Sequence, residues 1–143
     1  MILRHLTTRD KIPSIVEERI LRGSDNLRKA HKGFVSFELF NPNVDRDAFK
    51  RIYLQVKPDN FDFEDIVELL FDGNRMVENG IEIVDCFTDG KKDTKLELSI
   101  VPGINQADLE VMGNYQFVYG DVSLDYLTDE SKRYILENYN IEL

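Results

Sequence analysis

The first quarter of the chain most constrains its fold, because three short segments there follow one another closely. Residues 2–6 form an apolar run that includes His5, and this run predicts a first strand. A helix is expected over residues 10–21. Gly33 then leads a second apolar run, which predicts a second strand over residues 34–40. This order places a histidine and a strand where both can line one cleft.

The helix expected over residues 10–21 has sequence signals at both ends. Thr7 or Thr8 suits the N-cap, and Gly23 suits the C-cap. Its apolar side chains recur at spacings of three and four, the period of one helical face: Ile12, Ile15, Val16 and Ile20. We therefore expect this face to be buried against a sheet.

The rest of the chain contains mainly short segments with strand patterns. Strands are expected over residues 51–56, 81–87, 95–101, 109–112 and 115–119, and helices over residues 63–76 and 128–139. Because the strands gather in the second half and do not alternate with helices, the expected class is α+β with mainly antiparallel sheets. Tyr115, Phe117 and Tyr119 alternate on one strand face, which we interpret as core packing. A length of 143 residues suits a single domain, residues 1–143.

The charge balance restricts the kinds of partner. The formal net charge is −9. Phosphate backbones repel such a surface, so nucleic acid is not expected as an electrostatic partner. A local basic stretch over residues 28–32 is an exception and suits an anionic ligand. The acidic excess also suits docking to a basic protein.

The residue types that bind metals and form disulfides are few. Cys86 is the single cysteine, which excludes an intrachain disulfide and suits a reducing, cytoplasmic setting. His5, His31 and Cys86 are too few for structural zinc, so no metal is expected. No apolar stretch approaches about 18 residues, so no membrane contact is expected either.

Two acidic patterns admit more than one interpretation. The first lies at the start of the helix expected over residues 63–76 and consists of Asp59, Asp62, Glu64 and Asp65. Complementarity to the helix dipole explains it, and a magnesium site is the alternative. The second is the spacing of Asp85, Asp93 and Lys95, which is similar to a nuclease pattern. An overall acidic composition explains that pattern equally well.

The segments at the two ends of the chain resemble the ADP-ribosyltransferase fold. His5-Leu6-Thr7, the helical segment 12–21 and the Gly33–Phe37 strand follow the order of the DNA-targeting bacterial toxins and RNA 2′-phosphotransferases. Segment 117–127 is similar to the closing strand and turn of those families. The resemblance covers about half of the chain. It implies a small bacterial or phage protein of α+β class that binds NAD or a related nucleotide.

The resemblance also implies the roles of individual residues. The chemistry of these families is a displacement at the nicotinamide ribose carbon of NAD, in which a histidine on the first strand holds a ribose hydroxyl. The implied cofactor-binding residues are His5, Thr7, Gly33, Ser36 and Tyr53. If the protein is active, it transfers ADP-ribose to a macromolecule.

The catalytic carboxylate is the point at which the sequence departs from these families. Gln116 stands where active members tend to carry a glutamate, and Glu110 is the nearest alternative carboxylate. An amide forms hydrogen bonds but supplies no negative charge to a cationic transition state. The alternative function is therefore a non-enzymatic immunity or inhibitor protein that binds a basic protein through its acidic surface.

Overall fold

In the part of the chain that the structure describes, five strands form one antiparallel sheet, and two more form a small second sheet. The computed structural model describes residues 1–23, 33–40, 47, 50, 62–85 and 115–143. The strands are β1 (Ile2–Thr8), β2 (Ile20–Leu21), β3 (Phe34–Leu39), β4 (Ile66–Asp72), β5 (Val84–Asp85), β6 (Tyr115–Tyr119) and β7 (Val122–Ser123). The helices are α1 (Ile12–Glu18), α3 (Gly73–Glu78) and α6 (Asp129–Tyr139), with 3-10 turns η1 (Arg9–Lys11), η3 (Phe63–Asp65) and η4 (Leu124–Tyr126).

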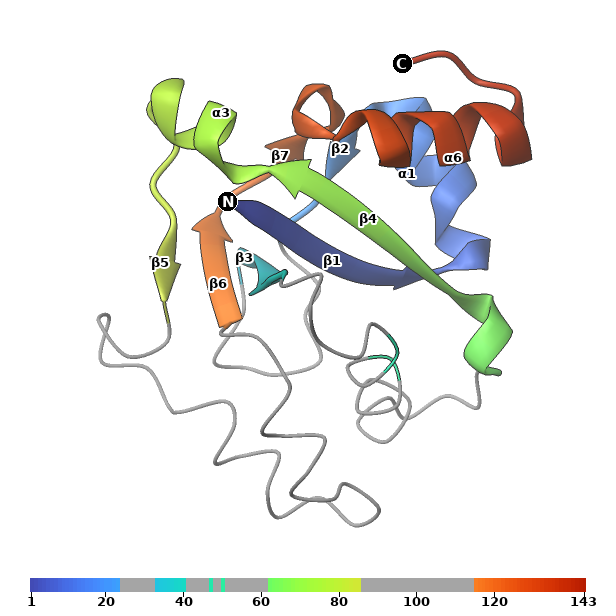
Figure 1. Cartoon of the computed structure of the whole chain (residues 1–143), viewed down its shortest axis with the longest axis horizontal. Coiled ribbons are helices and arrows are strands. Elements are labelled where there is room, and N and C mark those ends of the chain that lie inside the picture. The colour runs from blue at the N-terminus through green and yellow to red at the C-terminus, as the bar shows by residue number, and fades with distance from the viewer. Residues whose placement is uncertain (24–32, 41–46, 48–49, 51–61, 86–114) are drawn as a thin grey trace, which may run out of the picture.

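The large sheet has the strand order β4-β1-β3-β6-β5, and the small sheet pairs β2 with β7. Helices α1 and α6 lie on one side of the large sheet, close to the small sheet (Figure 1). The core lies between these layers, where Leu3, Phe37 and Leu69 of the sheet are fully or almost fully buried. Val16 of α1 and Ile135 of α6 belong to the same hydrophobic cluster. The α+β class and the antiparallel sheets are confirmed.

The first strand is longer than expected and the helix after it is shorter. β1 pairs with β4 over seven residues, from Ile2↔Asp72 to Thr8↔Ile66, and this ladder keeps both Thr7 and Thr8 in extended backbone. Lys11 therefore occupies the N-cap position of α1.

The end of α1 also differs from the expectation. Arg19 adopts the left-handed conformation at φ 59° and closes the helix, so Gly23 is not its C-cap. Ile20 then pairs with Ser123 in the small sheet. Val16 is buried as expected, whereas Ile15 and Ile20 are half-buried.

The helix expected over residues 63–76 is wrong, because this segment contains the edge strand β4 with a 3-10 turn before it. The apolar run is buried on both faces of the sheet: Ile66, Val67, Leu69, Leu70 and Phe71 are at most 6% exposed. A strand buried on both faces loses the alternation that distinguishes it from a helix. The helical part is α3, which begins only at Gly73.

The last helix begins and ends as expected. Thr128 is its N-cap, with its hydroxyl accepting a hydrogen bond from the Ser131 N–H at 3.3 Å. Asn140 closes it in the left-handed conformation at φ 54°. The Ser131 hydroxyl accepts a hydrogen bond from the Leu70 N–H at 2.8 Å, so α6 is attached to the edge strand β4.

The remaining expected elements divide into two groups. The strands expected over residues 34–40 and 115–119 are confirmed as β3 and β6, and part of the one over residues 81–87 is β5. Those expected over residues 51–56, 95–101 and 109–112 lie outside the described residues. Among the helices that the structure describes, none is both long and apolar enough to cross a membrane.

Candidate functional site

The ladder between β1 and β3 is short, and His5 lies just beyond the point where it ends. Only Leu3↔Leu39 and Arg4↔Glu38 are paired along these two described strands. At the next position the His5 Nδ1 atom lies 2.8 Å from the Ser36 carbonyl oxygen. A carbonyl only accepts hydrogen bonds, so Nδ1 carries the proton and donates. A neutral His5 ring therefore has its lone pair on Nε2.

Phe37 lies between the two residues for which the sequence suggests a role near the nicotinamide ribose. The His5 and Phe37 rings meet edge to face, with their centroids 5.8 Å apart. On the other side of β3, Phe37 pairs with Gln116 of β6. Gln116 in turn pairs with Asp85 of β5. Two of the predicted site residues, His5 and Gln116, are thus neighbours of the same buried phenylalanine.

A buried ion cluster lies one residue before His5. The Arg4 Nε atom donates to Glu38 Oε2 at 2.7 Å, and its Nη1 atom donates to Glu68 Oε2 at 2.8 Å. The Arg4 side chain is 2% exposed, and its guanidinium lies 5.1 Å from the centroid of the Phe40 ring. The cluster ties β1 to both of its neighbours, so it fixes the backbone that carries His5.

The other predicted site residues are distributed as follows. Thr7 is buried on β1, and Ser36 is half-buried on β3, where its carbonyl accepts from His5. Gly33 lies just before β3 at φ 87°, where a glycine is needed. Glu110, Tyr53 and the basic stretch over residues 28–32 lie outside the described residues.

Three glycines meet where β2, β3 and β6 come together, a contact that the sequence alone did not reveal. A Cβ atom on Gly23 would lie 2.4 Å from the Gly120 carbonyl oxygen and 2.9 Å from that of Gly33. The Gly120 N–H donates to the Gly33 carbonyl at 2.9 Å. The Gly23 N–H donates to Asp121 Oδ1 at 3.1 Å. Gly23 therefore allows the backbones to come close at this junction, and it does not end helix α1.

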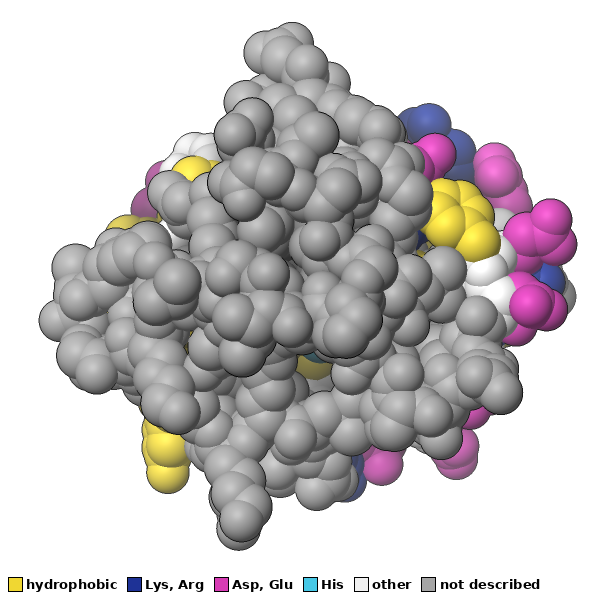
Figure 2. Space-filling view, turned by 90° about the horizontal axis from the view of Figure 1, so that it is seen from below, with side chains coloured by type: hydrophobic (Ala, Val, Ile, Leu, Met, Phe, Trp, Pro, Cys, Tyr) yellow, Lys and Arg dark blue, Asp and Glu magenta, His cyan; other side chains and the backbone are white. Residues whose placement is uncertain are grey.

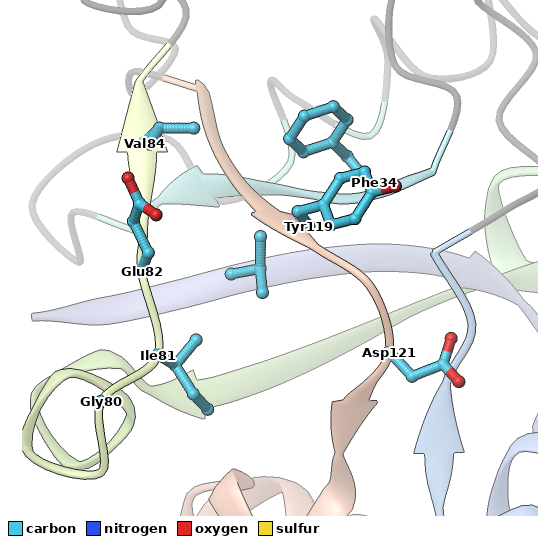
Figure 3. A pocket seen from close by; sticks show the side chains of 8 residues that line it. Phe34, Gly80, Ile81, Glu82, Val84, Tyr119 and Asp121 are labelled. Atoms are coloured by element: carbon cyan, nitrogen blue, oxygen red, sulfur yellow. The ribbon is translucent and has the colours of Figure 1, made fainter.

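A pocket of about 540 Å³ lies beside this junction, between the segment that leads into β5 and the end of β6 (Figure 3). Its lining residues are Phe34, Gly80, Ile81, Glu82, Val84, Val118, Tyr119 and Asp121. His5 and Gln116 are not among them. The interpretation of Tyr119 as core is wrong, because it is the last residue of β6 and is 77% exposed, whereas Phe117 is fully buried.

The acidic run around η3 does not mark a helix start. Asp62 and Glu64 are exposed at a 3-10 turn that leads into β4, and Asp59 lies outside the described residues. Acidic side chains gather at the right-hand margin of the face in Figure 2, the side on which η3 lies in Figure 1. Within the described ranges, no group of three or more His, Cys, Asp or Glu side chains is placed to hold a metal ion.

The antiparallel sheet, with a helix directly after its histidine-bearing strand, has an ADP-ribosyltransferase-like fold. It matches DarT of Thermus sp. 2.9 in complex with NAD+ at a TM-score of 0.58 and 12% identity, over 97% of this chain and 88% of that chain. DarT with carba-NAD+ gives 0.56 and 11%, with 97% and 88% covered. DarT with ADP-ribosylated ssDNA gives 0.57 and 10%, with 97% and 87% covered.

The TM-scores show a common fold at low sequence identity, and the expectation of that fold is confirmed. No family model matches the sequence, and no curated protein matches it significantly.

Proposed function

We propose that this protein binds NAD where β1 and β3 separate, with the His5 ring as one wall of the site. The observation that carries the proposal is the His5 to Ser36 hydrogen bond, which lies directly after the last β1–β3 pair. DarT, which has the same fold, holds NAD+ and carba-NAD+. That similarity supports a dinucleotide as the ligand class.

The two described candidates, His5 and Gln116, can each form hydrogen bonds with the nicotinamide half of the nucleotide. His5 donates through Nδ1 to the backbone, so its Nε2 atom is the one that would accept from a ribose hydroxyl. Gln116 offers an amide that both donates and accepts, which suits a ribose hydroxyl or the nicotinamide carboxamide. It cannot offset the positive charge that develops on the ribose, a task that needs a carboxylate. We assign that task to Glu110.

We further propose that bound NAD donates ADP-ribose to a macromolecule. The bond between the nicotinamide nitrogen and the ribose carbon breaks, a bond to an acceptor atom forms, and nicotinamide leaves. The acceptor proton is released to solvent. DarT in complex with ADP-ribosylated ssDNA supports this class of reaction on the same fold.

Calorimetry with NAD and carba-NAD tests the binding proposal. We expect His5→Ala to weaken binding by about 1–3 kcal/mol, which is roughly 5- to 150-fold, because it removes a ring that contacts the ligand. His5→Asn keeps a polar side chain and should retain part of the affinity. Glu137→Gln, an exposed change on α6, is the control and should bind as the wild type does. No heat with millimolar NAD in any variant would refute the proposal.

Release of nicotinamide from NAD tests the assignment of the carboxylate. We expect Gln116→Glu to raise the rate by roughly tenfold or more, because a charge facing the ribose stabilises its cationic transition state. We expect Glu110→Gln to lower the rate by a similar factor. If Gln116→Glu binds NAD normally and its rate is unchanged, Gln116 does not face the reacting carbon.

A further inference from the structure

The pocket beside the glycine junction has two walls of different character. Ile81, just before β5, and Val84, in β5, contribute aliphatic surface (Figure 3). Phe34 of β3 and Tyr119 of β6 contribute aromatic surface. The Phe34 and Tyr119 rings pack edge to face, with their centroids 5.2 Å apart. Since Tyr119 is 77% exposed, much of its surface is accessible to a partner.

Among the described residues that line the pocket, the two charged ones are acidic. Glu82 and Asp121 lie on opposite sides of it, each with an exposed side chain (Figure 3). Asp121 is oriented by the Gly23 N–H, which donates to its Oδ1 atom. An anionic ligand such as a dinucleotide would meet two carboxylates here. A cation would meet these carboxylates and an aromatic ring.

Arg22, which follows β2 and precedes Gly23, is engaged with an acidic side chain of this chain. Arg22 donates to Glu18 at 2.8 Å, four residues earlier in the chain. This hydrogen bond holds the pKa of the Glu18 carboxyl below its usual value, while the charge of Asp121 acts in the opposite direction.

We propose that this pocket receives an arginine side chain from a basic protein partner. A planar guanidinium can lie against Tyr119 while it donates hydrogen bonds to Glu82 or Asp121. Its aliphatic stem would pack on Ile81 and Val84. The net charge of −9 steers a basic protein toward the surface, and the pocket supplies the specific contact. His5 and Gln116, the described residues to which contacts with NAD are assigned, do not line this pocket.

Nuclear magnetic resonance titration with the peptide acetyl-Gly-Arg-Gly-amide tests the proposal. The neutral analogue, in which citrulline replaces arginine, has nearly the same shape without the charge. We expect the arginine peptide to shift the backbone signals of Gly80 and Tyr119, and the citrulline peptide to shift them little. Saturating NAD should leave these shifts unchanged, so a failure at this site is distinguishable from a failure of NAD binding.

Variants of the lining give the second readout. Tyr119→Ala and the pair Glu82→Gln with Asp121→Asn should each weaken the peptide roughly fivefold or more. Asparagine at position 121 keeps an oxygen that can accept from the Gly23 N–H. Glu78→Gln on α3 removes an exposed charge outside the pocket lining and should have little effect.

Four outcomes would overturn the proposal. The first is the absence of any shift up to about 20 mM peptide, a concentration above the dissociation constant of even a very weak complex. The second is an equal loss of affinity in Glu78→Gln, which would indicate general attraction to an acidic surface. The third is equal binding of a lysine peptide, and the fourth is a shift of Tyr119 by adenosine, which would assign the pocket to a base.

Discussion

Arg4 shows how much of this fold depends on single residues. Its guanidinium bonds to Glu38 and Glu68 inside the molecule, with 2% of the side chain exposed. Taking such charges out of water is costly, and only good hydrogen-bond geometry offsets that cost. The cluster also precedes His5 directly in β1. Arg4 is therefore a structural residue whose loss would disturb the proposed site indirectly.

Replacement of Arg4 tests this interpretation. We expect Arg4→Met to lower the free energy of unfolding by about 3–5 kcal/mol, because it leaves the buried carboxylate of Glu38 and the partly buried one of Glu68 without their guanidinium. Arg22→Ala removes an exposed i,i+4 pair with Glu18 and should cost at most about 0.5 kcal/mol. Urea unfolding of both variants provides the comparison. Similar losses in the two would show that the Arg4 cluster contributes no more than a surface pair.

Gly23 gives a second prediction at this scale. We expect Gly23→Ala to destabilise the protein by about 3 kcal/mol or more, because its Cβ would overlap backbone atoms of Gly120 and Gly33 that cannot move separately. Gly80→Ala meets no atom within 4 Å and suffers only from the positive φ of 84°. It should cost about 1–2 kcal/mol. Thermal unfolding that ranks Gly80→Ala as the worse change would contradict the packed glycine junction.

At the level of elements, the sequence predicts strands and helix caps well where neighbouring residues in the chain determine them. β3, β6 and the Thr128-capped α6 are predicted within a residue or so, because their patterns and caps are local. β4 is not, because burial on both faces removes its alternation. The length of α1 is not predicted either, because Ile20, in the expected last turn of the helix, pairs with Ser123 in the small sheet. Partners distant in the sequence decide both cases.

The attachment of α6 to β4 gives a prediction for these elements. We expect Ser131→Ala to cost about 1–3 kcal/mol, because it leaves the buried Leu70 N–H without the hydroxyl that accepts from it. Thr128→Ala removes the N-cap hydroxyl of the same helix and should cost about 1 kcal/mol. Hydrogen exchange at the Leu70 amide should accelerate in Ser131→Ala more than in Thr128→Ala. The reverse order would show that the cap, and not the strand attachment, holds α6.

At the scale of the whole molecule, the order of segments was enough to predict the fold, whereas the site residues stay predictions. The structure places two of them, His5 and Gln116, beside Phe37. The pocket between β5 and β6 was not identified, because its residues come from three separate segments without a common pattern. The exposure of Tyr119 depends on its place at the end of β6, which alternation alone does not reveal.

The central claim is that NAD binds beside His5, and the histidine ring signals test it most directly. The chain has two histidines, so a carbon-13 ring spectrum contains two Cε1–Hε1 signals, and His31→Gln assigns them. Titration with NAD should shift the His5 signal in a saturable way, and carba-NAD should do the same. If neither dinucleotide shifts the His5 signal at millimolar concentration while the protein remains folded, the account is contradicted.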